Sequence, residues 1–170
     1  RARPSGPTSR AVVEEVKRAL GARRAGHTGT LDPLATGVLT VCVGEATKLV
    51  QFLALDEKEY RATLRLGIRT DTLDIGGRVL SREEPRVTRA QVETVLAGLT
   101  GRRQQIPPRF SAVKVRGQAR YRWTRRGIDV EAPPREVEIH RIRIEEVRLP
   151  DVVFTVSCSK GTYIRTLCAE

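Results

Sequence analysis

Segments with strand-type and helix-type apolar patterns follow one another irregularly along the chain, and this order constrains its fold more than any other feature. Tyr60–Leu66 alternates polar and apolar residues as a half-buried strand does. The strand-type segments are Val38–Val43, Tyr60–Leu66, Val79–Ser81, Val137–Ile144 and Val152–Ser157, and the helix-type segments are Thr8–Leu20, Ala46–Leu55, Thr88–Leu99 and a last one after Thr162. We therefore predict an α+β fold whose central sheet, mixed or mainly antiparallel, is flanked by helices and loops.

Local signals mark the ends and irregularities of several segments. Thr8 or Ser9 is placed to cap the first helix, which Gly21 ends. Thr88–Leu99 is predicted as a capped helix with an apolar stripe made of Val92, Val95, Leu96 and Leu99. In the fourth strand-type segment the alternation changes phase at His140-Arg141, which predicts a bulge.

The chain is strongly basic, with 31 Lys and Arg against 20 Asp and Glu and a formal net charge of +11. Arginine outnumbers lysine, and its planar guanidinium group can bond two phosphate oxygens at once. This balance favours RNA or DNA over a membrane surface as the partner, because the sequence has no apolar span of about 18 residues and no basic amphipathic helix. Composition alone leaves open a protein whose charge is spread over a solvated surface.

Basic residues are dense between Arg102 and Arg135, where apolar periodicity is poor and aromatic residues lie among the arginines. Basic side chains near aromatic rings suit phosphate contact combined with stacking on loop bases. We predict that 102–135 is an exposed insertion that contacts RNA, although some of its arginines are only solvated.

The chain has three cysteines and two histidines without CxxC spacing: Cys42, Cys158, Cys168, His27 and His140. This set predicts no metal site and no disulfide framework. Cys42 lies in the β-branched run Val38–Val43, so we expect a buried strand with a buried structural thiol. Because the sequence carries no signal peptide, we expect a cytoplasmic protein.

The segment Gly26–Gly37 combines glycines and threonines with one carboxylate, Asp32, directly before Pro33. Its glycines allow backbone conformations that other residues avoid and let a ligand approach closely. Pro33 favours an extended backbone at Asp32. An acidic side chain in so constrained a loop suits a nucleophile, but on local sequence alone the favoured role of Asp32 is to close a turn.

Gly26–Gly37 resembles the signature loop of the TruB-type pseudouridine synthases, enzymes that modify uridine 55 in the T-arm of tRNA. Further blocks resemble the family in the same order and span nearly the whole chain: Arg3–Ser9, Leu66–Asp74, Pro107–Val115 and Lys160–Thr166. Arg3 stands where lysine is usual. Leu34-Ala35-Thr36 resembles the stand-alone bacterial enzymes rather than their guide-RNA-dependent relatives. The resemblance implies the pseudouridine synthase fold and a tRNA-modifying isomerase.

The resemblance implies that Asp32 is the catalytic aspartate, that Arg165 pairs with it and that Tyr60 lies against the target uracil. The family's reaction breaks the N1–C1′ bond, turns the uracil and rejoins it through C5. It implies no cofactor, because the base is both leaving group and returning nucleophile. Asp32 would act by covalent capture or by promoting loss of the C2′ proton, and both paths stay open. Without the resemblance, Arg165 is one more surface cation and Tyr60 an ordinary strand aromatic.

The resemblance also assigns residues to RNA contact. His27 would enter the RNA loop as the uridine flips out, because the gap left in the base stack costs free energy unless a side chain fills it. Tyr163 would form a wall of the uracil pocket. Thr30, Arg109 and Lys114 lie in the matched blocks and are further candidates. A loop histidine that bonds only to backbone is the alternative for His27.

We expect the chain to be the catalytic portion of a longer protein, incomplete at both ends, with the family's remaining strands and its C-terminal PUA domain beyond Glu170. The predicted form is a monomer that acts on the T-arm stem-loop of tRNA without a protein partner. The alternatives are an RNA-binding scaffold, a guide-dependent relative in a ribonucleoprotein and a metal-dependent nuclease. For the last, Asp71 and Asp74 are the candidate carboxylates, and they are better explained by a turn.

Overall fold

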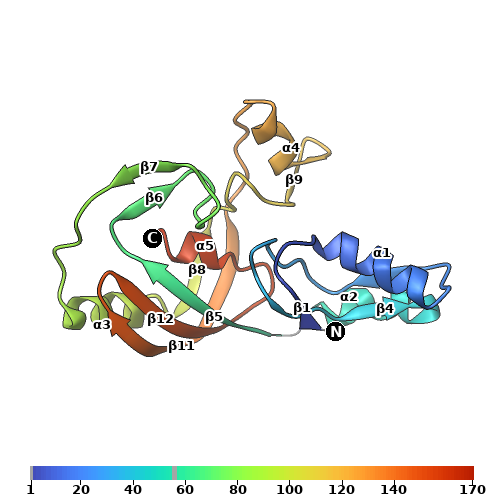
Figure 1. Ribbon diagram of the computed structural model, residues 1–170, viewed down its shortest axis with the longest axis horizontal. Coiled ribbons are helices and arrows are strands. Elements are labelled where there is room, and N and C mark those ends of the chain that lie inside the picture. Colours follow the sequence, from blue (N-terminus) through green and yellow to red (C-terminus); the bar gives the residue numbers. More distant parts are fainter. Residues whose placement is uncertain (1, 55–56) are drawn as a thin grey trace. The chain divides into compact units, whose positions relative to one another are not determined.

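The computed structural model describes residues 2–54 and 57–170, and the chain divides into two compact units, residues 1–56 and 57–170 (Figure 1). Each unit has its own short helices and antiparallel strands. Within the described ranges, no helix combines the length and the apolar character that crossing a membrane requires.

Unit 1 combines one longer helix with two pairs of short antiparallel strands. Its elements are β1 (Ala2–Arg3), α1 (Ser9–Ala19), β2 (Ala25–His27), β3 (Gly37–Val38), β4 (Val41–Val43), the 3-10 helix η1 (Gly44–Leu49) and α2 (Val50–Leu53). β1 pairs with β3, β2 pairs with β4, and α1 packs against β2 and β4.

Helix α1 begins and ends as the sequence predicts. The hydroxyl of Thr8, the N-cap residue, accepts a hydrogen bond of 3.2 Å from the N–H of Ala11. Val12 and Val13 of the helix are buried. After the helix, Gly21 adopts a left-handed φ of 59°, which glycine tolerates best.

Two predictions for unit 1 need correction. The run Val38–Val43 is not one buried strand, because its ends pair with different strands: Val38 in β3 is 78% exposed, whereas Cys42 in β4 is buried as predicted. The segment predicted as the helix Ala46–Leu55 is divided between η1 and α2, and Leu55 lies outside the described residues.

Unit 2 is built on a four-stranded antiparallel sheet with the strand order β5-β12-β11-β8. Two hairpins, β6–β7 and β9–β10, lie outside it. The elements are β5 (Lys58–Arg65), β6 (Ile68–Thr70), β7 (Val79–Arg82), α3 (Arg89–Gly98), β8 (Gly101–Gln105), β9 (Lys114–Val115), β10 (Gln118–Ala119), α4 (Arg120–Arg125), β11 (Arg135–Arg148), β12 (Asp151–Cys158) and α5 (Ile164–Leu167). The α+β prediction with a mainly antiparallel sheet is therefore confirmed.

Two helices cover one face of this sheet. Every second residue of β12 is buried, namely Val152, Phe154, Val156 and Cys158. Leu167 of α5 joins the cluster around Phe154, while Val92 and Leu96 of α3 pack with Val152. Because alternate residues of a strand share a face, α3 and α5 lie on the same side of the sheet. Val95 was predicted in the apolar stripe of α3 but is 60% exposed. The residues of α3 that are buried against the sheet are Val92 and Leu96.

The predicted bulge in β11 is confirmed. The pairing between β11 and β12 shifts between Ile139 and Arg141. A second shift, between Ile144 and Glu146, was not predicted. Such irregularities increase the local twist of the bulged strand.

Candidate active site

Arg3 organises the loop that carries Asp32. The side chain of Arg3 is buried, with 1% of the residue exposed. Its guanidinium group donates hydrogen bonds to the backbone carbonyls of Pro7, Asp32 and Ala35, and a further one of 3.2 Å to that of Pro33. The carbonyls of the predicted nucleophile and of two residues that follow it therefore converge on one buried cation. The sequence showed Arg3 only as a departure from the family's usual lysine, and its burial was missed.

Ser9 gives the same loop a second anchor. Its hydroxyl accepts a hydrogen bond of 3.0 Å from the N–H of Leu31, the residue before Asp32. The N–H of Ala35 donates to the carbonyl of Asp32 at 2.9 Å, so this segment does close a turn. The turn is made by the backbone of Asp32, so its half-buried carboxylate is not required for the turn.

His27 and Thr30 lie in the same loop region as Asp32. His27 is the last residue of β2, where it pairs with Val41, and it is half-buried. Within the described residues its Nδ1 atom is buried without a hydrogen-bond partner, which does not fit the alternative of a histidine that bonds to backbone through this atom. Thr30 is exposed.

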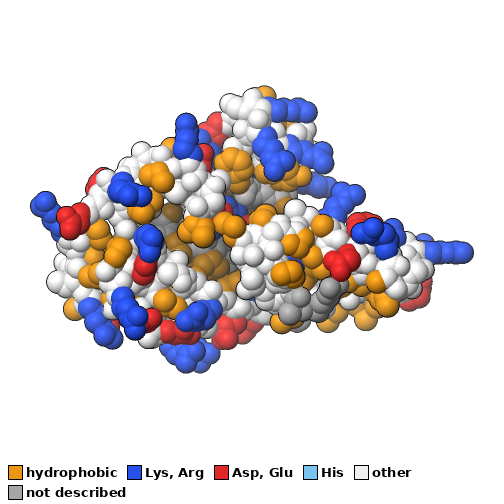
Figure 2. All heavy atoms as spheres, viewed as in Figure 1, with side chains coloured by type: hydrophobic (Ala, Val, Ile, Leu, Met, Phe, Trp, Pro, Cys, Tyr) orange, Lys and Arg blue, Asp and Glu red, His pale blue; other side chains and the backbone are white. Residues whose placement is uncertain are grey.

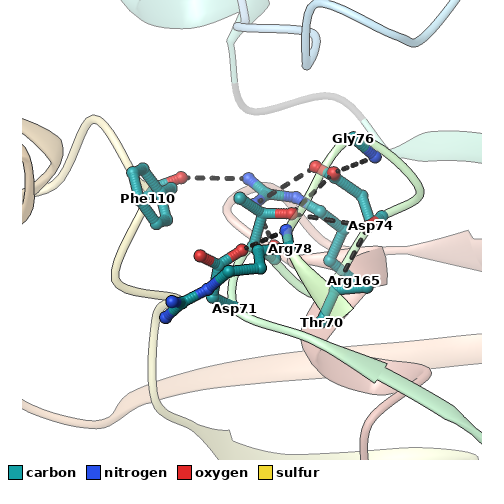
Figure 3. A network of polar contacts seen from close by, with 8 residues as sticks. Thr70, Asp71, Asp74, Gly76, Arg78, Phe110 and Arg165 are labelled. Carbon is teal, nitrogen blue, oxygen red and sulfur yellow. Dashed lines mark hydrogen bonds and ion pairs between the residues drawn. The ribbon is translucent and has the colours of Figure 1, made fainter. Parts of the chain in front are cut away.

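Arg165 lies in α5 within a set of polar contacts from two other segments (Figure 3). Its guanidinium group donates to the carbonyl of Thr72 at 2.8 Å and to that of Phe110 at 3.1 Å. The carboxylate of Asp74 lies 3.7 Å from Arg165 Nη1. The side chain is 11% exposed, so Arg165 is not the ordinary surface cation that its sequence alone suggested.

The loop between β6 and β7 shapes this surrounding of Arg165. Asp74 Oδ1 accepts from the hydroxyl of Thr72 at 2.8 Å and from the N–H of Gly76 at 2.9 Å. Asp71 Oδ1 accepts from the N–H of Arg78 at 2.9 Å. The prediction that these two carboxylates serve a turn is confirmed, but the contact of Asp74 with Arg165 was missed. Its position in the matched block Leu66–Asp74 was the available signal.

A side chain at Gly77 would disrupt this loop. A Cβ atom there would lie 2.2 Å from the hydroxyl of Thr72 and 2.7 Å from Oδ1 of Asp71, both far closer than packing allows. Only glycine lets the loop fold so tightly.

The two candidate tyrosines lie in different elements of unit 2. Tyr60 is on the inward face of β5, pairs with Val156 and packs against the core cluster that contains Phe154. Tyr163 immediately precedes α5, two residues before Arg165. Both are half-buried, which suits rings that present one side to a ligand.

The basic segment folds around an arginine of its own. Arg120, at the start of α4, is 6% exposed and donates to the carbonyls of Val130, at 2.9 Å, and Pro107. The indole N–H of Trp123 donates to the carbonyl of Val115 at 3.1 Å. These contacts join β9, β10 and α4 into the lobe labelled α4 and β9 in Figure 1, which we call the basic lobe, residues 106–134.

Basic side chains gather over the basic lobe (Figure 2). Those exposed are Arg109, Lys114, Arg116, Arg122, Arg125 and Arg126. The guanidinium carbon of Arg125 lies 5.3 Å from the centre of the Tyr121 ring, within the range of a cation–π contact. Arg109 pairs with Asp129 at 2.5 Å.

The limits predicted for the basic insertion need correction. Residues 102–105 belong to β8, which pairs with β11 in the main sheet, and Arg135 belongs to β11 itself. Arg102 lies 3.7 Å from Glu138 and Arg103 lies 2.6 Å from Glu170, so both take part in ion pairs of the sheet region. The pairing of β8 with β11 joins residues 30 to 38 positions apart, so it was not visible in the local composition.

Burial disfavours the thiolate form of two of the three cysteines. Cys158 and Cys42 are buried, and burial raises the pKa of Cys158. Burial also raises the pKa of Cys168 to about 11. A thiol is a nucleophile only as thiolate, so neither Cys158 nor Cys168 competes with Asp32 for a catalytic role at neutral pH.

The structure thus groups His27, Thr30 and Asp32 in one loop region of unit 1, and it places Tyr60, Arg109, Lys114, Tyr163 and Arg165 in unit 2. The predicted pairing of Asp32 with Arg165 joins the two units and stays a prediction.

Comparison with known proteins supplies the family. A family model described as "TruB family pseudouridylate synthase (N terminal domain)" matches residues 17–164. The tRNA pseudouridine synthase B of Syntrophus aciditrophicus is 58% identical over 165 residues, which are 97% of this chain and 53% of that protein. That of Geotalea uraniireducens is 48% identical over 167 residues, 98% of this chain and 54% of that protein. The chain spans about half the length of these curated relatives.

Solved structures support the same assignment. A chain of a Cbf5-Nop10-Gar1 complex matches with a TM-score of 0.71 and 32% identity, over 98% of this chain and 40% of that chain. A chain of an H/ACA RNP bound to a substrate RNA matches with a TM-score of 0.69 and 29% identity, over 98% and 39% of the two chains. The predicted pseudouridine synthase fold is therefore confirmed. Because the family model also covers most of the sequence, this chain belongs to the TruB family of pseudouridylate synthases.

Proposed function

We propose that this chain carries the catalytic residues of a tRNA pseudouridine synthase that converts uridine 55 of the T-arm to pseudouridine. The observation that carries the proposal is the loop around Asp32, which the buried Arg3 and the hydroxyl of Ser9 hold in place within a chain of this family. A nucleophile needs such fixed geometry, because much of the barrier to a reaction is removed by holding the reacting atoms in position.

Asp32 assists the breaking of the N1–C1′ bond in this proposal. The electron pair of that bond leaves with the uracil, which then turns and bonds to C1′ through C5, and the C5 proton departs last. Arg165 pairs with Asp32 and holds the carboxylate in position, because the planar guanidinium fork can bond both carboxylate oxygens. The carbonyls of Thr72 and Phe110 support this role, since they aim the guanidinium group before any RNA binds.

The remaining candidates contact RNA in this proposal. Tyr60 and Tyr163 line the uracil pocket, and His27 fills the gap that the flipped base leaves. Thr30 contacts the RNA loop next to His27. Arg109 and Lys114 contribute phosphate contacts from the basic lobe, where their exposure supports such a role.

A guide-dependent enzyme is the second candidate, because the solved relatives come from a Cbf5-Nop10-Gar1 complex and an H/ACA RNP. Those chains are 32% and 29% identical to this one, whereas relatives named tRNA pseudouridine synthase B reach 58%. This difference favours an enzyme that acts on tRNA without a guide RNA or a protein partner.

The test is to incubate the full-length natural protein with an unmodified tRNA transcript and to map pseudouridine chemically at every uridine. We expect product at uridine 55 without added partners. Asp32→Asn should bind the tRNA with unchanged affinity and form no product, while Glu14→Gln, an exposed change in the same unit, should retain full activity. Turnover by Asp32→Asn would contradict the proposed nucleophile, and a requirement for guide RNA would favour the second candidate.

A further inference from the structure

We propose that Gln105 is a positioning residue for Arg165, acting through the backbone of Tyr163. This inference rests on the proposed function and assigns a role to a residue outside the predicted site. Gln105 is the last residue of β8 and is 2% exposed. A buried polar side chain at the end of a strand must find hydrogen-bond partners, because leaving it unpaired costs free energy.

Both partners of the Gln105 amide belong to one residue. Its Oε1 atom accepts a hydrogen bond of 2.7 Å from the N–H of Tyr163, and its Nε2 atom donates one of 3.2 Å to the carbonyl of Tyr163. The side chain thus pairs with the extended backbone of Tyr163 as a neighbouring strand would. Two bonds fix the direction of that backbone as well as its place.

Helix α5 depends on such an external anchor. It has only four residues, Ile164–Leu167, and the side chain of its N-cap residue, Tyr163, forms no capping hydrogen bond within the described part of the chain. A single helical turn is unfavourable by itself, because many dihedral angles are fixed for few hydrogen bonds. The carbonyl of Tyr163 also accepts from the N–H of Leu167 at 3.0 Å, so the Gln105 amide holds an acceptor of the helix itself.

Arg165 lies between the two fixed points of this turn. At one end Gln105 holds Tyr163, and at the other the side chain of Leu167 is buried in the core with Phe154. The segment that follows Gln105 in the sequence contains Phe110, whose carbonyl accepts a hydrogen bond from the guanidinium group of Arg165. Gln105 therefore fixes both the origin of the Arg165 side chain and the start of a segment that receives its guanidinium group.

The test compares Gln105→Met, which keeps the shape but removes donor and acceptor, with Gln104→Met on the exposed side of the same strand. The assay measures the single-turnover rate of pseudouridine formation at saturating full-length enzyme, and separately the Kd for tRNA. We expect the rate of Gln105→Met to fall by about 10- to 100-fold, as misplacement of a catalytic group by about 1 Å does. The Kd should change less than about 3-fold, and Gln104→Met should match the wild type in both.

A stability control separates positioning from general weakening of the fold. Val92→Ala removes methyl groups from the contact of α3 with the sheet, away from α5, and should lower Tm without slowing the reaction below that Tm. If Val92→Ala slows the reaction as much as Gln105→Met at a similar loss of Tm, the proposal is overturned. A wild-type rate for folded Gln105→Met overturns it as well.

Further outcomes decide between the inference and the proposed function. If Gln105→Met does not fold, Gln105→Glu is the second variant, because it keeps an acceptor for the N–H of Tyr163 and loses the donor. The same loss of rate is expected for it. If neither variant folds, the amide serves the fold and the proposal is overturned. A wild-type protein that forms no pseudouridine at any uridine overturns the proposed function and this inference together. An active wild type with equally active Gln105 variants overturns only the inference.

Discussion

Replacing Arg3 by Met should loosen the loop that carries Asp32 while leaving the rest of unit 1 folded. The substitution removes hydrogen bonds to four backbone carbonyls. Two of these have a second donor, since Asp32 O accepts from Ala35 N–H at 2.9 Å and Pro33 O from Gly6 N–H at 2.8 Å. For the carbonyls of Pro7 and Ala35, the structure gives no other donor among the described residues.

The magnitude follows from these two carbonyls. A buried acceptor left unsatisfied costs about 1–3 kcal/mol, so the pair costs at most about 2–6 kcal/mol, and water that reaches the exposed Pro7 lowers this sum. Removing a buried guanidinium group also removes the desolvation of its charge, which offsets part of this loss. We expect the opening free energy of the loop to fall by about 2–4 kcal/mol. Arg3→Lys keeps the charge but not the planar fork, and should lose about half as much.

Amide hydrogen exchange measures this opening directly. The reporters are the N–H groups of Leu31 and Ala35, which donate to Ser9 Oγ and to Asp32 O. A loss of about 2–4 kcal/mol corresponds to exchange that is about 30- to 1,000-fold faster. Arg10→Met, an exposed change on α1, is the control and should leave both rates unchanged. Rates within about 3-fold of the wild type in Arg3→Met would refute the role assigned to Arg3.

Two further predictions concern unit 2. Arg120→Met removes the donors to the carbonyls of Val130 and Pro107. The N–H of Tyr121, which donates to Ser111 O, should then exchange at least about 30-fold faster, whereas the exposed change Arg122→Met should not alter its rate. Equal protection of this N–H in both variants would contradict the structural role of Arg120. Burial raises the pKa of Cys168 from 9.0 to about 11, so between these two pH values the folded protein keeps the thiol proton that the unfolded chain loses. The free energy of unfolding should therefore fall as the pH rises from 9.0 to about 11. Urea titrations should show a smaller fall for Cys168→Ala, and equal pH slopes would contradict this account.

Local patterns in the sequence predicted the longer elements of the fold, namely α1, α3, β5, β11 and β12, but not the short strands β1, β2, β6, β8, β9 and β10. The caps at Thr8 and Thr88, the alternation of β5 and the bulge near Arg141 all depend on neighbouring residues, and all four are present. The run Val38–Val43 failed because its division depends on two separate strand partners. A β-branched run favours a strand whichever partner it has, so it does not specify the pairing.

The predicted site residues came from the resemblance, and the groups that hold them came from the structure. Arg165 meets the carbonyls of Thr72 and Phe110, which are 93 and 55 positions away in the sequence. Gln105 holds Tyr163 across 58 positions. No periodicity or local motif encodes such contacts, because they depend on the strand order of the sheet and on where its loops return.

The sequence by itself determined the family, the α+β class, the identity of the candidate carboxylate and the basic character of the surface. Tertiary structure alone decided which of many arginines are buried: Arg3 and Arg120 each hold backbone carbonyls, whereas Arg122 lies at the surface. These side chains have the same chemistry. What separates them is whether the surrounding backbone directs several carbonyls at the guanidinium group, and only the folded chain brings those carbonyls together.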